Sequence, residues 1–188
     1  MESSLVISGF GGQGVLTAGQ ILAKAFMLEG LNITWLPAYG AEMRGGTVNC
    51  TLSFAQEEVA SAYIEVPENV IALNLPSFER FESKVKSGGT ILINSSLVDA
   101  KPKRTDIFYK YIPLTEIASK IGDVKTANVA AIGAFLATMP HIKLDNVKDV
   151  IVNLLKNKKE QLIDKNIKAL HAGYEFIKSK AMVQSVNS

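Results

Sequence analysis

A glycine-rich segment near the N-terminus limits the folds open to this chain more than any other feature. It reads Gly9-Phe10-Gly11-Gly12-Gln13-Gly14 and matches the pattern G-x-G-x-x-G. A short β-forming apolar run, 5–7, precedes it, and apolar residues at helical spacing follow it over 15–28. Residues 32–36 form a second β-rich run, which Pro37 is expected to end. Strand, glycine turn, helix and strand in this order predict a βαβ unit with parallel strands and a right-handed crossover.

The spacing of these glycines has physical reasons. Gly9 permits a tight turn, Gly11 lets another group approach the backbone, and Gly14 lets helix and strand pack closely. The helix that follows presents free N–H groups and a partial positive charge, which suit an anion. The glycines therefore serve either a phosphate or carboxylate ligand, or only close packing and chain reversal. The sequence leaves both roles open.

Two nucleotide-binding motifs fit this segment poorly. A dinucleotide site needs an acidic residue at the end of the second strand to hold the ribose hydroxyls. Here that strand ends in Thr34-Trp35-Leu36-Pro37, with no acid. A P-loop needs Gly-Lys-Ser or Gly-Lys-Thr at the turn, and the turn here ends in Gly14-Val15. The sequence thus disfavours nicotinamide binding and supports no kinase or ATPase.

The rest of the pattern completes an α/β fold. Further strands are predicted at 47–54, 70–73, 90–94 and 107–112. Short helices are expected near 76–85 and 113–121, and the pattern is helical from about residue 126 to the end. Residues 127–139 are apolar on nearly every side, as in a buried helix, and Asp145 is expected to cap the next one. We expect one domain over residues 1–188: α/β, Rossmann-like and three-layered, with a doubly wound, mainly parallel sheet and a helical C-terminal region.

Composition removes several classes of function. The single cysteine, Cys50, cannot form an internal disulfide, and His141 and His171 lie far from it in sequence. A zinc site or an iron–sulfur cluster within this chain is therefore close to excluded. No apolar run reaches the roughly 18 residues of a membrane span, and the N-terminus lacks the basic stretch of a signal peptide. A net charge of +2 gives no argument for nucleic acid. We expect a cytoplasmic protein with no metal of its own and no membrane or nucleic-acid partner.

Charge is unevenly distributed along the chain. Residues 143–188 hold nine lysines and five acidic residues, whereas residues 1–142 hold eleven basic and thirteen acidic residues. A solvated helix surface is the simpler interpretation of the basic end. A docking surface for an acidic partner is the second one.

A second glycine-rich loop, residues 38–47, follows the second predicted strand. In a doubly wound sheet this loop and the glycine turn lie at the carboxyl edge, where ligands and partners bind. Arg44 could offer its guanidinium to a carboxylate or phosphate, or it could pair with Glu42 and hold the loop. Asn74 and Asn94 follow other strands at the same edge, where helix capping and turn formation are the simpler roles.

Four stretches together resemble a known family. They are residues 9–15 (GFGGQGV), 39–47 (YGAEMRGGT), 73–77 (LNLPS) and 88–96 (GGTILINSS). Over almost its whole length the chain is similar to the gamma subunit, or gamma domain, of the 2-oxoacid:ferredoxin oxidoreductases. It looks most like the stand-alone gamma subunit of the 2-oxoglutarate enzyme. The resemblance implies an α/β fold and no cofactor held by this chain itself.

The resemblance also implies a redox activity that several chains share. Such enzymes oxidatively decarboxylate a 2-oxoacid, transfer the acyl group to coenzyme A and pass two electrons to ferredoxin. Alpha and beta subunits hold thiamine diphosphate and Mg²⁺, and iron–sulfur clusters, often partly on a delta subunit, carry the electrons. We expect this chain to be an accessory subunit, inactive alone, of an enzyme that converts 2-oxoglutarate to succinyl-CoA. Pyruvate, 2-oxoisovalerate and indolepyruvate are the alternative substrates.

Two sets of site residues follow from the resemblance. We expect one set to face the thiamine or coenzyme A site of the partner subunits: Gly11, Gly12, Gln13, Gly14 and Arg44. We expect the other set to contact those subunits: Tyr39, Glu42, Arg44, Gly45 and Gly46. No catalytic residue and no metal ligand are expected in this chain. Two other classes stay open: a stand-alone nucleotide- or anion-binding module, and a structural, oligomer-forming protein.

Overall fold

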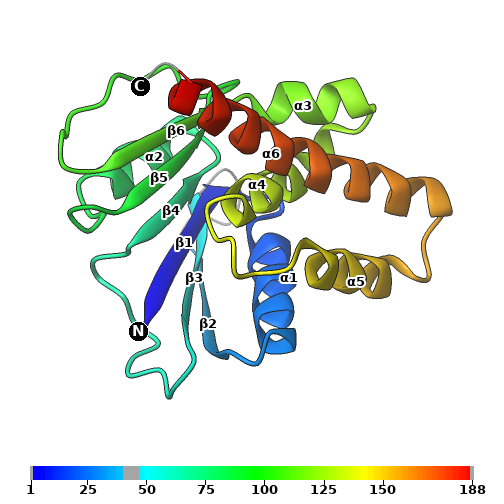
Figure 1. Ribbon diagram of the computed structural model, residues 1–188, viewed down its shortest axis with the longest axis horizontal. Coiled ribbons are helices and arrows are strands. Elements are labelled where there is room, and N and C mark those ends of the chain that lie inside the picture. The colour runs from blue at the N-terminus through cyan, green and yellow to red at the C-terminus, as the bar shows by residue number, and fades with distance from the viewer. Residues whose placement is uncertain (1, 40–46, 187–188) are drawn as a thin grey trace.

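Six strands form one twisted sheet (Figure 1). A computed structural model describes residues 2–39 and 47–186, with the backbone alone for Tyr39 and for residues 181–186. The sheet order is β2-β3-β1-β4-β5-β6. The strands are β1 (Ser3–Phe10), β2 (Asn32–Tyr39), β3 (Thr47–Ala55), β4 (Asn69–Ala72), β5 (Thr90–Asn94) and β6 (Phe108–Ile112). Because β1, β4, β5 and β6 pair in parallel and β3 is antiparallel to both β1 and β2, five strands run one way and β3 alone runs the other.

Seven helical segments accompany the sheet in the part of the chain that the structure describes. They are α1 (Val15–Leu28), α2 (Leu75–Glu82), α3 (Leu114–Ile121), the short 3₁₀ helix η1 (Val124–Thr126), α4 (Ala127–Leu136), α5 (Leu144–Leu155) and α6 (Glu160–Val186). The predicted α/β class, the mainly parallel sheet and the helical C-terminal region are confirmed. No helix of the described chain is long and apolar enough to cross a membrane.

The first βαβ unit is more complex than the sequence predicted. Strands β1 and β2 do run in the same direction, but β3 lies between them and pairs with both. Only seven residues separate β2 from β3, and a parallel neighbour needs a crossover of a dozen or more. The prediction that Pro37 ends the second strand is wrong, since β2 continues to Tyr39. Because β2 is an edge strand, Pro37 needs no amide N–H on its outer side.

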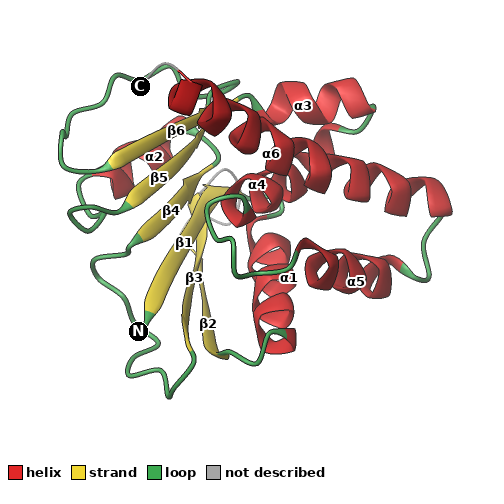
Figure 2. Ribbon diagram, viewed as in Figure 1, coloured by secondary structure: helices red, strands yellow, loops and turns green. Residues whose placement is uncertain are grey.

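The two faces of the sheet are covered unequally (Figure 2). On one face, side chains of α1, α4, α5 and α6 join those of the strands in a large core that includes Phe26, Leu52 and Phe135. On the other face, a smaller core centres on Phe78 and Phe81 of α2, packed against residues of β1, β4 and β5. The three predicted layers are therefore present, and of the described helices only α2 forms the thinner outer one.

The helices α4 and α6 cross at very short range. A Cβ atom added to Gly133 of α4 would lie 1.9 Å from the carbonyl oxygen of Leu170, and one added to Gly173 of α6 would lie 1.9 Å from that of Ala130. Residues 128–136 of α4 are all buried, as the apolar sequence predicted. The C-terminal helix α6 thus closes over α4 through a backbone contact that only glycine permits.

The helix expected near Asp145 begins slightly earlier. Lys143 occupies the N-cap position of α5 and makes no side-chain cap hydrogen bond, so the prediction of an Asp145 cap is wrong. Asp145 lies instead in the first helical turn, where its negative carboxylate interacts favourably with the positive end of the helix dipole.

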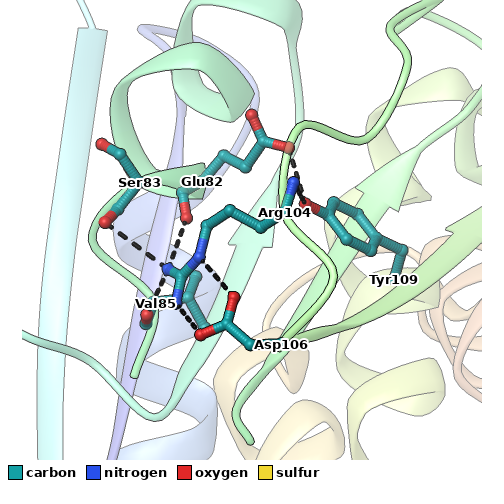
Figure 3. A network of polar contacts seen from close by, with 6 residues as sticks. All are labelled: Glu82, Ser83, Val85, Arg104, Asp106 and Tyr109. Carbon is teal, nitrogen blue, oxygen red and sulfur yellow. Dashed lines mark hydrogen bonds and ion pairs between the residues drawn. The ribbon is translucent and has the colours of Figure 1, made fainter. Parts of the chain in front are cut away.

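A basic loop is attached to the end of α2 by one arginine (Figure 3). The Arg104 guanidinium donates to the carboxylate of Asp106 at 2.6 and 2.9 Å and to the carbonyl oxygens of Glu82 and Val85. The buried Glu82 carboxylate accepts from the backbone N–H of Lys103 at 2.7 Å and from the Tyr109 hydroxyl at 2.6 Å. The bonds from Arg104 give hydrogen-bond donors to carbonyl oxygens at and just after the end of α2. Together with those to the Glu82 carboxylate, they fix residues 103–106.

Candidate functional site

The glycine turn lies at the carboxyl end of β1 and has two different sides. Gly12 and Gly14 have φ angles of 93° and 72°, which favour glycine. A Cβ at Gly14 would lie 2.4 Å from Nδ2 of Asn128, and that amide donates to the Gly14 carbonyl oxygen at 3.1 Å. Gly14 therefore packs α1 against α4. At Gly11 and Gly12, by contrast, an added Cβ would meet nothing within 4 Å.

Gln13 holds the turn against the next strand. Its Oε1 accepts from the Phe10 backbone N–H at 2.7 Å and from Nδ2 of Asn74 at 2.9 Å. Its Nε2 donates to the Leu73 carbonyl oxygen at 3.4 Å. The side-chain amide is thus engaged at both ends, so its first role is to fix the turn relative to β4.

Two asparagines extend this polar network across the edge. Asn74 caps α2 by accepting from the Ser77 N–H at 2.9 Å, which confirms the capping role that its position suggested. Asn94 donates to the Leu73 carbonyl oxygen at 3.3 Å and to the Thr115 hydroxyl at 2.9 Å. The carboxyl ends of β1, β4 and β5 are therefore linked through side-chain amides.

Two small cavities flank the outer side of the glycine turn. One, of about 230 Å³, is lined by Gly12, Gln13, Asn94, Leu97, Val124 and Lys125 among others, and no carboxylate lines it. The other, of about 240 Å³, lies among α1, η1 and α4 to α6 and also borders Gly12 and Lys125, but the carboxylate residue Asp123 lines it too, so the first cavity is the one that suits an anion. A lysine beside an open glycine backbone and an uncapped helix N-terminus suits an anionic group.

Exposed apolar side chains surround this edge. Phe10 at the end of β1, Leu75 at the start of α2, Leu97 after β5 and Val124 in η1 are 38%, 37%, 50% and 55% exposed, and we call these four residues the apolar rim. Several large apolar residues gathered around one edge mark a surface for another protein more often than a free surface. The edge thus combines an apolar rim with a cationic centre.

The predicted site residues divide into two groups. Gly11 to Gly14 come together at the carboxyl edge, and the backbone of Tyr39, paired with Val48, ends β2 at the same edge. Glu42, Arg44, Gly45 and Gly46 lie outside the described residues. The roles given to both groups stay predictions.

Sequence reasoning missed Lys125, Val124 and Leu97. No motif marks them, because they meet Gly12 from positions more than 80 residues further along the chain. It also missed Asn128 as the partner of Gly14. The one available signal was the polar start of an otherwise apolar helix.

The one cysteine and the two histidines of the chain have different surroundings. Over the described ranges, no three His, Cys, Asp or Glu side chains cluster so as to hold a metal ion. Cys50 is fully buried, and this burial raises the pKa of its thiol to about 11, so the thiol stays protonated near neutral pH. His141 and His171 are exposed.

Comparison with known sequences gives a family. The model of the family "pyruvate ferredoxin/flavodoxin oxidoreductase" matches residues 4–176. The ketoisovalerate oxidoreductase subunit VorA of Methanothermobacter marburgensis is 35% identical over 93% of the chain, although the chain spans only 36% of that relative. The 2-oxoglutarate synthase subunit KorC of Methanocaldococcus jannaschii is 28% identical over 95% of both chains.

Solved structures share the fold. The 2-oxoglutarate:ferredoxin oxidoreductase of Magnetococcus marinus superposes with a TM-score of 0.86 at 22% identity over 95% of this chain and 31% of that one. The keto/oxoacid ferredoxin oxidoreductase gamma subunit of Geobacter sulfurreducens has a TM-score of 0.80 at 24% identity, over 94% of this chain and 99% of that one. The sheet with its one reversed strand, the glycine turn at its carboxyl edge and the match over residues 4–176 lead to one conclusion. The chain belongs to the pyruvate ferredoxin/flavodoxin oxidoreductase family.

Proposed function

We propose that this chain is the gamma subunit of a multi-subunit 2-oxoacid:ferredoxin oxidoreductase. The observation that carries the proposal is the family match over residues 4–176, together with stand-alone relatives such as KorC that align along their whole length. The chain spans about a third of the VorA relatives, in keeping with a unit that works together with further protein. Its partners are alpha and beta subunits, with a delta subunit in some complexes.

In this role the chain is an accessory subunit. Thiamine diphosphate with Mg²⁺ supplies the decarboxylation chemistry, and iron–sulfur clusters the electron transfer, on the partner subunits. The described side chains of this chain include no ligand cluster for a metal, and the only cysteine is buried. What the chain itself contributes is a docking edge: the apolar rim excludes water at the contact, and Gly12 with Lys125 faces the anionic groups of coenzyme A or thiamine diphosphate.

The substrate we propose is 2-oxoglutarate, which the name of the full-length relative KorC supports. A second candidate is 2-oxoisovalerate, because VorA is more similar in sequence than KorC. Pyruvate is a third candidate, because the pyruvate synthase subunit PorC of Methanocaldococcus jannaschii is 32% identical to this chain. Partner chains that hold the thiamine cofactor would select among these acids.

Reconstitution tests the proposal. The chain is co-expressed with the alpha, beta and delta chains of such an enzyme from the same organism, and the purified complex is assayed with coenzyme A and a viologen dye. We expect dye reduction with one of 2-oxoglutarate, 2-oxoisovalerate, pyruvate and indolepyruvate, and none with the chain alone. Turnover by the isolated chain, or full turnover by a complex that lacks it, contradicts the accessory role.

Lys125 and the open Gly11–Gly12 backbone also favour a second candidate, a stand-alone anion-binding module. A thermal-shift titration with coenzyme A, NAD and inorganic phosphate separates the two candidates. It is carried out once on the isolated chain and once on the chain together with the partner subunits. Saturable stabilisation by NAD favours the module, whereas a response to coenzyme A only in the presence of the partner subunits favours the gamma subunit.

A further inference from the structure

A second apolar surface lies between helices α1 and α5, apart from the carboxyl edge. A groove of about 500 Å³ is lined by Lys24, Met27 and Leu28 of α1 and by Val150, Asn153 and Leu154 of α5. Met27, Leu28 and Leu154 are 62%, 60% and 42% exposed. We call this surface the α1–α5 groove.

The α1–α5 groove is centred at the end of α1 that lies away from the glycine turn, although Leu154 lines both the groove and the cavity beside Gly12 and Gly14. Val15 begins α1 beside the turn, and Met27 follows it by twelve residues, which is roughly 18 Å along a helix axis. In Figure 1, α1 runs down from the turn, and α5 lies beside it. None of the four residues of the apolar rim lines the groove, so a partner seated there contacts other side chains than those of the rim.

The charge that lines the groove is positive. Lys24 is the one charged residue that lines it, and no described carboxylate forms an ion pair with Lys24. The exposed charges on α5 and just beyond it are of both signs: Lys148, Lys156 and Lys158 are exposed, and so are Asp145 and Asp149. Residues 143–160 hold five lysines and three acidic residues. An occupant that complements this surface carries carboxylates beside its apolar side chains.

These charges also decide against a second copy of the chain. A symmetric pair built on the groove would bring each Lys24 towards the same patch on the other copy, because a two-fold interface uses the same surface of both copies. Like charges facing one another at an interface disfavour the contact. The groove between two helices instead suits an amphipathic segment from a different protein.

We propose that the α1–α5 groove binds an amphipathic segment of a partner subunit, with Leu, Ile, Val, Phe or Met side chains in the groove and Asp or Glu at its rim. The proposal rests on the proposed function in so far as the segment belongs to a subunit of the same enzyme. Met27 supports this use because an unbranched thioether side chain adapts to the shape of its partner. The groove anchors a second subunit contact while the carboxyl edge faces the catalytic subunits.

Site-directed photocrosslinking tests the proposal in cells that express the complete set of subunits. A benzophenone side chain replaces Met27, and the crosslinked peptide is identified by mass spectrometry. We expect a peptide in which apolar residues alternate with Asp or Glu, from one of the other subunits. Lys24→Glu is expected to lower the crosslink yield about fivefold at low salt, and the loss should shrink at high salt.

The matched control is Lys86→Glu, which makes the same charge change at an exposed lysine outside the groove. It should leave the yield within about a factor of two. A crosslink to another copy of this chain, to a peptide without acidic residues, or to nothing while the complex is intact overturns the docking proposal and leaves the proposed function standing. An acid-flanked crosslinked peptide from a protein unrelated to the oxidoreductase also overturns the proposal that a partner subunit occupies the groove, and the reconstitution assay then decides separately whether the chain acts as a gamma subunit.

Discussion

At the scale of single residues, the glycine turn depends on Gln13. Its side chain accepts from Phe10 and Asn74 and donates to Leu73, and so joins β1 to β4. Replacement by alanine leaves two donors without their acceptor. We expect Gln13→Ala to lower the free energy of unfolding by about 1–2 kcal/mol, measured by urea denaturation.

Gln13→Glu is the control for this prediction. A glutamate keeps the acceptor for Phe10 and Asn74 and loses only the donor to Leu73. It should therefore cost less stability than the alanine variant. If both variants unfold at the same urea concentration as the unchanged chain, the network does not stabilise the turn.

The Asp106 carboxylate makes stability depend on pH. Hydrogen bonds from the Arg104 guanidinium lower the pKa of Asp106 from 3.8 to about 2. Since the folded pKa is the lower one, the stabilisation is fully present above pH 4 and is lost as the pH falls from 4 to 2. The urea midpoints of the unchanged chain and of Asp106→Asn should therefore differ at pH 7 and converge over this interval.

The double variant with Arg104→Gln isolates the pair. Without the guanidinium, Asp106→Asn should change the midpoint by the same small amount at every pH between 2 and 7. A convergence that persists in the Arg104→Gln background would assign the pH dependence to another group.

At the scale of elements, the α4–α6 crossing is the least tolerant contact. An alanine at Gly173 would place its Cβ 1.9 Å from a backbone oxygen of α4, so the helices must move apart. In the interior of a helix, alanine normally makes the helix more stable than glycine does, by about 1 kcal/mol. Here we expect Gly173→Ala to lower the free energy of unfolding by roughly 3 kcal/mol. The thermal midpoint measured by calorimetry should then fall by roughly 6–12 °C.

Gly11→Ala serves as the matched control for the crossing. An added Cβ at Gly11 meets nothing within 4 Å, so its thermal midpoint should stay within about 2 °C of the unchanged chain. A Gly173→Ala protein as stable as the Gly11→Ala protein would mean that α6 can shift without loss of packing.

Most elements could be predicted from sequence because their signals are local. The glycine turn, the apolar period of α1 and the buried pattern of α4 each lie within about twenty consecutive residues. The place of β3 could not be predicted in this way, since pairing with β1 depends on partners forty residues away. The short link from β2 to β3 does carry the information that these two strands are antiparallel.

The candidate site was predicted less completely than the fold. Gly11 and Gly12 form its open backbone, as their spacing suggested. Lys125 and the apolar rim were missed, because residues from four separate stretches of chain meet there only after folding. Local motifs reveal a turn, but they do not reveal which distant side chains surround it.

At the scale of the whole molecule, the apolar rim predicts how the chain enters its complex. Val124→Asp places a carboxylate where the proposed interface excludes water, and we expect about tenfold weaker binding to the alpha and beta subunits. The isolated variant should keep its thermal midpoint, since Val124 is 55% exposed. Binding is measured by titration of labelled chain into the partner subunits.

Val66→Asp is a closely matched control, because Val66 is 56% exposed and lies in a loop outside the carboxyl edge. It should bind as the unchanged chain does. Equal losses for Val66→Asp and Val124→Asp would mean that added negative charge, rather than the apolar rim, weakens assembly.

The position of β1 in the sheet has a consequence for synthesis on the ribosome. Strand β1 is made before both of its neighbours, β3 and β4, yet it lies in the middle of the sheet. At about 5–20 residues per second, the 45 residues from Phe10 to Ala55 take roughly 2–9 s to emerge. During that interval the nascent chain presents an apolar strand with two open edges. The glycine turn, which we propose meets the partner subunits, is thus attached to a strand that a molecular chaperone would protect during synthesis.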